Sequence, residues 1–428
     1  MLPIQDHPLR YQLANELHAR PFPSMSCPSS VVYLAIKRPH DAVSRDRAAD
    51  LDHLKALLDR HGAPHPQPGA THYSAQIGRH VIKWEQHTEF VSYTAYTDGL
   101  SARAFDPADF EVFPDSWLVQ APGVLMTSVS LRVCPQTDPD ATQAALADWF
   151  VPESLAVARI LDDAALVAGD FRIDPAGHVR FAVFVPPSTG ARRIGRVVQR
   201  MLEIETYKAM SMLGFSRARS LAGPLTALDN RLSELMMQIS GDDSATDAEP
   251  RLASLLTIAA ELETMVARNS FRFGATGAYE ALVGQRIALL REERFGGRQS
   301  FADFMMRRFD PAMRTVTSTQ TRLQALADRA MRAGELLRTR VDVDRSAQNQ
   351  ALLASMDRRA DLALRLQHTV EGLSVVAIAY YAVSLAAYAL YPLGQVLGLS
   401  KGMLTASVTP PVVLLVWLAI RRIRKRLA

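Results

Sequence analysis

The chain of 428 residues is poor in cysteine and lacks the common signatures of enzymes and metal proteins. Its two cysteines, Cys27 and Cys134, form no CxxC pair, so a disulfide framework is excluded and reduced thiols are expected. No GxGxxG turn, GxxxxGK[ST] loop, GxSxG elbow, HExxH pair or Cys/His finger spacing occurs. The first 22 residues have no apolar core of the kind found in a signal peptide. The sequence therefore predicts no cofactor, no bound metal and a protein that is not an enzyme.

A strong charge of one sign is also lacking. The formal net charge is only +4, from 48 Lys and Arg against 44 Asp and Glu. A basic tail at residues 421–428 alone contributes five positive charges, from Arg421, Arg422, Arg424, Lys425 and Arg426, so the rest of the chain is close to neutral. Because nucleic-acid-binding domains carry a basic face or stripe, the sequence predicts no nucleic-acid partner.

Two long apolar runs stand out near the C-terminus, at residues 373–393 and 403–420, and neither contains a charged residue. About 20 apolar residues are needed to cross the hydrocarbon core of a membrane. The linker at 394–402 is too short to form a domain, so the runs predict a transmembrane hairpin over 372–420. Buried core helices are the alternative reading.

Basic residues indicate the orientation of this hairpin. They follow the second run and precede the first, whereas the linker contains only Lys401. Since basic residues stay on the cytoplasmic side, we expect a multi-pass protein of the bacterial inner membrane with both termini in the cytoplasm. The lipid bilayer is then its first partner.

Small and hydroxyl-bearing residues recur along the first run at alternating steps of three and four. This spacing places them on one stripe of a helix, which lipid does not favour. The stripe fits a helix-packing seam, which we favour, or the wall of a pore in an oligomer. It consists of Ser374, Ala377, Tyr381, Ser384, Tyr388, Tyr391 and Gln395.

The middle of the chain, residues 189–371, is predicted to be a helical bundle and stalk. We expect a helix over 192–215, bends or ends at Gly214 and Gly223-Pro224, a loop over 241–250 and a helix over 251–294. After Asp310-Pro311 no proline occurs until Pro392, which predicts one helix of about 80 residues leading into the first span.

Apolar residues on this last helix also alternate by three and four, as in a coiled coil: Leu323, Leu326, Ala330, Ala333 and Leu337. Such a seam needs a partner. The sequence therefore predicts either self-association through the stalk and first span, or folding back of the preceding helices onto the seam.

Residues 1–188 mix strand and helix patterns and predict an α+β, sandwich-like cytoplasmic domain. Strands are expected at 31–36, 77–84, 89–96 and 124–133, followed by a hairpin of 166–173 with 178–185. Helices are expected at 41–60 and 139–150.

A polar cluster near the N-terminus consists of Asn15, Glu16, His18 and Arg20. Glu and His side chains can perform acid–base chemistry, but such a cluster more often caps a short helix and pins a terminal segment. We favour the structural role. Nine of the eleven histidines lie before residue 90, without the spacing of a metal site.

Three stretches of the chain resemble a bacterial family, domain-of-unknown-function family 3422, whose members are described only as membrane-anchored. They are HPLRYQLANELHARPF at 7–22, RRIGRVVQRMLEIETYKAM at 192–210 and QNQALLASMDRRADLALRLQHTVEGLSVVAIAYY at 348–381. The resemblance spans nearly the whole chain and implies membrane attachment.

The layout also resembles CorA-type magnesium channels, in which a cytoplasmic α/β domain and a long stalk helix lead into two spans. Their Gly-Met-Asn signature is absent, because Gly402-Met403 is followed by Leu404. The leading hypothesis is a non-enzymatic, homo-oligomeric inner-membrane protein of CorA-like architecture, with ion conduction as a separate addition to it. The alternatives are a membrane-tethered scaffold that recruits partners, and a membrane-anchored enzyme that uses the N-terminal cluster.

Overall fold

The computed structural model describes residues 4–16, 22–40, 44–136, 138–241, 248–397 and 399–427. The chain divides into two compact units. The sheet unit comprises Met1–Ser240 and Ser254–Ala333, and the C-terminal unit comprises Gly241–Ala253 and Gly334–Ala428.

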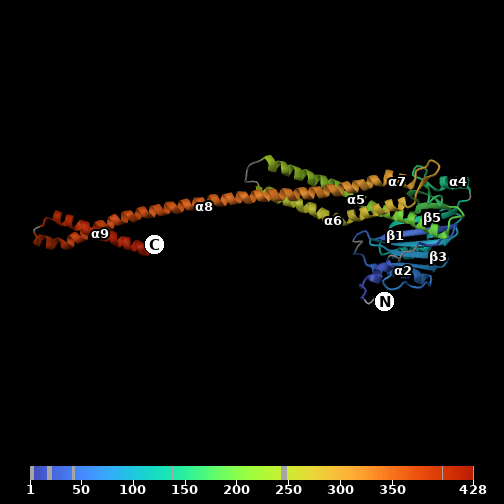
Figure 1. Ribbon diagram of the computed structural model, residues 1–428, viewed down its shortest axis with the longest axis horizontal. Helices are drawn as coiled ribbons and strands as arrows, with labels where there is room; N and C mark the ends of the chain where they lie inside the picture. The colour runs from blue at the N-terminus through green and yellow to red at the C-terminus, as the bar shows by residue number, and fades with distance from the viewer. Residues whose placement is uncertain are drawn as a thin grey trace. The chain divides into compact units, whose positions relative to one another are not determined.

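The sheet unit is built on one nine-stranded sheet in the order β2-β3-β4-β1-β5-β8-β7-β6-β9. Neighbouring strands are antiparallel except β5 and β8, which are parallel. The strands are β1 (Ser29–Lys37), β2 (His72–Ile77), β3 (His80–Gln86), β4 (Phe90–Asp98), β5 (Val124–Pro135), β6 (Ala156–Ile160), β7 (Ala165–Ile173), β8 (Val179–Val185) and β9 (Glu293–Arg294). Figure 1 shows these strands with the helices that pack on them.

Two clusters of buried side chains lie on one face of the sheet. On the β1–β4 half, α2 (Arg47–Arg60) and α3 (Asp115–Leu118) cover a core that includes Trp84, Tyr93 and Trp117. The connection to α3 contains a 3₁₀ helix, η2 (Pro107–Val112). On the β5–β8 half, α4 (Pro139–Trp149) covers a second core around Leu146 and Phe184. The alternation of side chains along each strand sends the residues between these positions to the opposite face.

That opposite face carries α5 (Ala191–Gly241) and α7 (Phe301–Arg308). On α5, Thr206 Oγ1 lies 2.8 Å from the Tyr33 hydroxyl of β1, and Gln199 contacts Lys83 of β3. Phe301 of α7 packs against Phe181 of β8. Helices therefore cover both faces of the sheet, and the predicted mixture of strands and helices in an α+β domain is confirmed.

Three helices extend from the sheet: α5, α6 (Ala248–Ala288) and the first part of α8 (Asp310–Val396). Arg322 of α8 bonds to Asp229 of α5 at 2.8 Å, and Arg231 of α5 approaches Glu261 of α6 at 3.3 Å. The stalk seam residues Leu323, Leu326, Ala330 and Ala333 are buried in the single chain. The preceding helices therefore fold back onto this part of the seam, which is one of the two predicted ways of covering it.

The expected ends within the helical region were wrong. Helix α5 continues through Gly214, Gly223 and Pro224 to Gly241. Buried Leu221, Leu225 and Leu228 on both sides of the proline stabilise the helix enough to offset its cost. Helix α6 ends at Ala288, not at 294, because residues 293–294 pair with β6.

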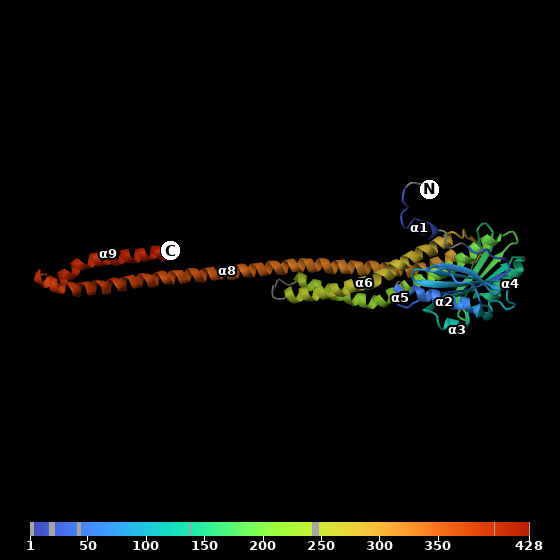
Figure 2. The same cartoon turned by 90° about the horizontal axis from the view of Figure 1, so that it is seen from below.

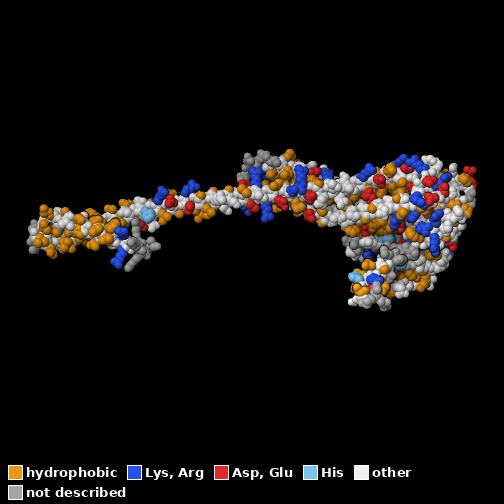
Figure 3. Space-filling view, viewed as in Figure 1, with side chains coloured by type: hydrophobic (Ala, Val, Ile, Leu, Met, Phe, Trp, Pro, Cys, Tyr) orange, Lys and Arg blue, Asp and Glu red, His pale blue; other side chains and the backbone are white. Residues whose placement is uncertain are grey.

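In the C-terminal unit, α8 reaches Val396 and α9 (Lys401–Leu427) follows a short connection. Both helices are long and apolar enough to cross a membrane. Figures 1 and 2 show α9 running back beside α8 from this connection. The helices approach closely at Gly394, where an added Cβ would lie 3.2 Å from the Leu404 side chain. Apolar side chains cover the surface of this hairpin (Figure 3).

Candidate functional site

Strands β3 and β4 present a polar face beneath α5. Lys83 and Glu85 alternate with the core residue Trp84, and Ser92 and Thr94 alternate with the core residue Tyr93. These polar side chains are not solvated, since Lys83, Ser92 and Thr94 are only 8%, 2% and 3% exposed. Buried polar groups need partners within the protein. The polar face is thus a built interior surface.

A chain of hydrogen bonds joins this face to two helices. Lys83 Nζ lies 3.1 Å from Glu85 Oε1 and donates to Gln199 Oε1 at 3.2 Å. Gln199 Nε2 donates to Glu203 Oε1 at 2.9 Å, and Arg286 of α6 donates to the other oxygen of Glu203. Two carboxylates and two cations therefore alternate around one amide.

Hydroxyl groups surround this chain. Burial raises the pKa of Tyr33, against a smaller lowering by its hydrogen bond with Thr206. Burial also raises the pKa of Tyr96, and the nearby charge of Glu85 raises it further. Both phenols therefore keep their protons throughout the physiological range and can donate hydrogen bonds.

Two adjoining cavities open onto this polar surface. The Lys83 cavity, lined by the hydrogen-bonded chain, Tyr33 and the hydroxyls of β4, has a volume of 260 Å³. The His72 cavity extends over β2 and has a volume of 710 Å³. Both cavities share Phe22, Lys83 and Tyr96. Together they are large enough for a small organic molecule.

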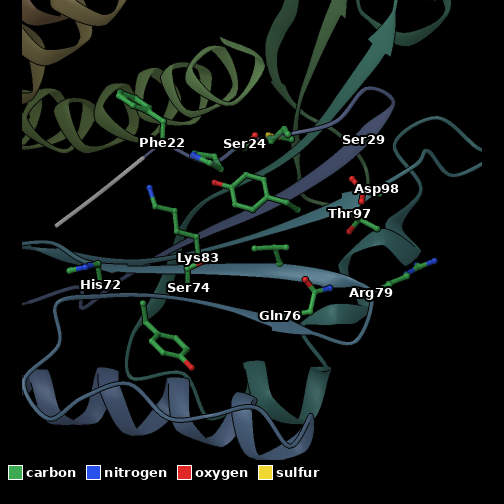
Figure 4. A pocket seen from close by; sticks show the side chains of 15 residues that line it. Phe22, Ser24, Ser29, His72, Ser74, Gln76, Arg79, Lys83, Thr97 and Asp98 are labelled. Atoms are coloured by element: carbon green, nitrogen blue, oxygen red, sulfur yellow. The ribbon is translucent and has the colours of Figure 1, made fainter. Parts of the chain in front are cut away.

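Figure 4 shows the His72 cavity, with His72, Ser74 and Gln76 spaced along one strand and Lys83 rising from the next. The buried Nδ1 of His72 has no hydrogen-bond partner within the described part of the chain. The segment from Phe22 to Met25 contacts the start of α5, where the Met25 N–H donates to the Ala191 carbonyl at 3.1 Å. Its Pro23 carbonyl approaches α5 so closely that a Cβ on Gly195 would lie 1.8 Å from the oxygen.

A separate pocket of 480 Å³ lies between α8 and α9. Tyr380, Ser384, Tyr388 and Tyr391 line it from α8, and Lys401 lies with its Nζ 6.0 Å from the centre of the Tyr388 ring. Leu404, Thr405, Thr409 and Val413 line it from α9. This hairpin pocket combines hydroxyl groups with one cation near the connection between the helices.

The predicted stripe is divided between two surroundings. Ser384, Tyr388 and Tyr391 line the hairpin pocket. The other members, Ser374, Ala377, Tyr381 and Gln395, do not line it and are exposed on α8, Tyr381 to 67%. The surface of α8 that faces α9 consists largely of small residues, such as Ala379 and Ala387, which are half-buried. Both roles of the stripe, a packing seam between helices and the wall of a pore, stay predictions.

The N-terminal polar cluster falls largely outside the described residues. Asn15 and Glu16 end helix α1 (Arg10–Glu16), but their side chains are not described. His18 and Arg20 lie outside the described residues altogether. The structure therefore brings no described side chain of this cluster into a site.

The thiols and histidines form no reactive or metal-binding centre among the described residues. Both Cys27 and Cys134 are free, and burial raises the pKa of each thiol. A raised pKa keeps a thiol protonated and a weak nucleophile. Within the described ranges, no three His, Cys, Asp or Glu side chains gather in a way that could hold a metal ion.

One protein family matches nearly the whole chain. A profile described as "Protein of unknown function (DUF3422)" matches residues 5–427. The chain belongs to the DUF3422 family. Neither the curated proteins nor the solved structures contain a match. The likeness to CorA-type channels therefore stays a resemblance of layout.

In this DUF3422 chain, the stretches that carried the resemblance border the two sites. Phe22 ends the first stretch and lines both sheet cavities, while the second stretch supplies Gln199, Glu203 and Thr206 of α5. The third stretch contains the start of the predicted stripe. Sequence reasoning missed the cavity residues because they come from distant segments. The only local signal was the alternation of polar and apolar residues in 83–86 and 91–95.

Proposed function

We propose that this DUF3422 protein is an integral protein of the bacterial inner membrane, anchored by the α8–α9 hairpin and assembled into a homo-oligomer through α8. The two apolar helices and the basic residues around them support a membrane crossing with both termini in the cytoplasm. The observation that carries the assembly is a single uncharged stripe along α8.

This α8 stripe extends the sequence-predicted stripe upstream in the same register. Its members alternate by three and four residues without interruption, which is the 3.5-residue period of a left-handed coiled coil. No charged residue belongs to it, although Asp357, Arg358 and Arg365 lie on the same stretch of helix. The members are Leu353, Met356, Ala360, Ala363, Gln367, Val370, Ser374, Ala377, Tyr381, Ser384, Tyr388, Tyr391 and Gln395.

Among the described residues, most of the stripe has no cover in the single chain, since only Ser384, Tyr388 and Tyr391 line the hairpin pocket beside α9. All of its members except the half-buried Ser384 are exposed, Leu353 to 64% and Met356 to 58%. Apolar surface in water costs about 25 cal/mol per Å², so a partner helix on Leu353, Met356 and Val370 would stabilise the chain by several kcal/mol, on the order of 1 to 2 for each side chain. A heptad stripe is the surface that another helix covers best.

A second copy of the same chain is the partner that fits. Every copy enters the membrane in the same orientation, so the stripes of neighbouring copies run parallel and each position can meet itself. Gln367 and Gln395 can then pair through their amides. Leu352, Leu366 and Leu373 flank the stripe and are also at least 60% exposed, which widens the apolar face. A wide face favours more than two helices, because each helix then touches two neighbours.

Disulfide trapping tests this assembly. In a chain with Cys27→Ser and Cys134→Ala, single cysteines are introduced at Met356 or Val370, and at Arg365 as the matched control off the stripe. Parallel copies in register bring equal stripe positions within the Cα distance that a disulfide spans. We expect crosslinked dimers in membranes for M356C and V370C but not R365C. Monomers for all three variants would exclude the assembly.

Ion passage is the second candidate, favoured by the hydroxyl-bearing half of the same stripe. Inside the membrane, Ser374, Tyr381, Ser384 and Tyr388 would offer oxygen atoms where lipid-facing helices carry alkyl side chains. Hydroxyl oxygens lining a gap between helices can replace part of the hydration shell of an ion. Lys401 near the connection disfavours cations at that end.

Reconstitution into liposomes tests passage. We expect ion flux above that of empty vesicles, reduced by S384L and Y388L, while L385A on the exposed surface beside the stripe leaves it unchanged. Absence of flux from crosslinkable oligomers would remove conduction and leave the tethered-scaffold reading. Replacing residues 403–420 by an unrelated apolar helix would then preserve the phenotype.

A further inference from the structure

We propose that the Lys83 cavity is a binding site for a small zwitterion of the amino-acid class. The proposal concerns the sheet unit alone and does not depend on membrane assembly. It rests on the opposite charges that face one polar cavity and on the hydroxyl groups around them.

The charges that the described residues bring to the cavity balance. Lys83 and Arg286 supply two cations, and Glu85 and Glu203 supply two carboxylates. A ligand with a net charge would bring an uncompensated charge into a poorly solvated space, which weakens its binding. A polar ligand without net charge avoids this cost.

The geometry of the ion pair selects within that class. Lys83 Nζ and Glu85 Oε1 lie 3.1 Å apart on neighbouring cavity-facing positions of β3. The ammonium and the carboxylate of an α-amino acid are likewise close together, because only the Cα atom separates them. An antiparallel arrangement lets the ligand carboxylate meet Lys83 while the ligand ammonium meets Glu85, giving two charge-assisted contacts.

The walls accommodate the remainder of such a ligand. Ser92, Thr94 and Tyr96 of β4 line the Lys83 cavity beside the pair. The adjoining His72 cavity gives room for a side chain and offers the Nδ1 of His72, which has no hydrogen-bond partner among the described residues, as a hydrogen-bonding atom. A polar side chain such as the amide of glutamine therefore fits this direction better than an aliphatic one.

Isothermal titration of the full chain in detergent tests the proposal. The probes are L-glutamine and L-serine as zwitterions, with acetate and methylamine as matched half-ligands. We expect a zwitterion to bind at least about tenfold more tightly than either half-ligand, because only it completes both contacts. No binding by any probe, or equal binding by a half-ligand, would overturn the proposal.

Variants separate binding from folding. The double variant Lys83→Met/Glu85→Leu replaces the ion pair by apolar side chains of similar volume, which often leaves stability unchanged or improved. We expect it to retain its unfolding temperature but to lose zwitterion affinity at least about tenfold. Lys55→Met, on the exposed surface of α2, is the control and should bind as the parent does. Unchanged affinity in the double variant would also overturn the proposal.

Discussion

Single glycines decide how closely two segments of this chain can approach. Gly195 admits the Pro23 carbonyl onto α5, and Gly214 admits Thr276 of α6, whose Oγ1 would lie 2.1 Å from an added Cβ. Other helical glycines have open space at the same position, among them Gly277. Since the amino-acid type is the same, only the tertiary contact distinguishes them.

Gly195→Ala is expected to destabilise the sheet unit. The new methyl group collides with the Pro23 carbonyl, and the backbone must shift, at a cost of about 1 to 3 kcal/mol. The control Gly277→Ala should instead gain about 0.5 to 1 kcal/mol, because alanine favours a helix. Chemical unfolding of the full chain in detergent, followed by tryptophan fluorescence, measures both. Equal gains for the two variants would contradict the close approach.

His53 is expected to make stability depend on pH. It lies in the core, stacked on Trp117 at 3.9 Å, with its ring nitrogens 2.9 Å from the Tyr93 hydroxyl and 3.1 Å from the Trp117 carbonyl. Burial lowers the pKa of His53 below its usual 6.5, against smaller raising effects of the Trp117 carbonyl and Asp50. The unfolded chain therefore binds a proton near pH 6.5 that the folded chain resists. This contribution to stability is fully present above pH 6.5 and is lost as the pH falls from 6.5 to the lower pKa of the folded state.

Comparison with His53→Gln isolates this contribution from those of the other histidines. The variant is expected to be less stable at neutral pH. Its free energy of unfolding should nevertheless fall less steeply below about pH 6.5, by up to about 1.4 kcal/mol per pH unit. Denaturant unfolding at a series of pH values measures the two slopes. Parallel slopes would show that His53 does not titrate with folding.

At the scale of elements, the sequence predicted the strands that carry a strong apolar pattern of their own, even where their partners are far along the chain, as for β1 with β4 and β5. The hairpin of β7 and β8 follows from alternating apolar residues around the turn at Asp174–Gly177, and β1 from a run of buried residues. Strands β2 and β6 were missed. HYSAQI has little apolar character, and AVARI is short. Pairing with β3 and β7 stabilises these segments as strands, and their own residues do not indicate this pairing.

Helix α5 shows the same limit in reverse, because local signals for a break were overridden by packing. Pro224 lacks an N–H and cannot bond to the carbonyl four residues earlier. Pro224→Ala is therefore expected to stabilise the protein by about 1 to 3 kcal/mol without changing the fold. Thermal unfolding with circular dichroism checks this result. A loss of stability would indicate that the chain needs a bend at this position.

At the scale of the whole molecule, the two candidate sites differed in how far the sequence could predict them. The α8 stripe is a periodic pattern within one helix. Its C-terminal part, from Ser374 to Gln395, was predicted, and its N-terminal part, from Leu353 to Val370, continues the same spacing. The Lys83 cavity unites Lys83 and Glu85 of β3, Gln199 and Glu203 of α5, and Arg286 of α6. No periodicity links these positions, because long-range packing alone brings them together.

The proposed parallel assembly of α8 depends on α8 and α9 crossing the membrane. In the cysteine-free chain, Ser400→Cys places a thiol in the connection between α8 and α9, and Ser346→Cys places one on the exposed part of α8 before the apolar run. Basic residues flank the apolar runs on the side of Ser346, so that side should stay in the cytoplasm. A membrane-impermeant maleimide added to intact spheroplasts should label S400C. It should label S346C only after the membrane is opened. Equal labelling of both thiols before opening would show that the helices do not cross the bilayer, and the parallel assembly of α8 would lose the constraint that keeps its copies in register.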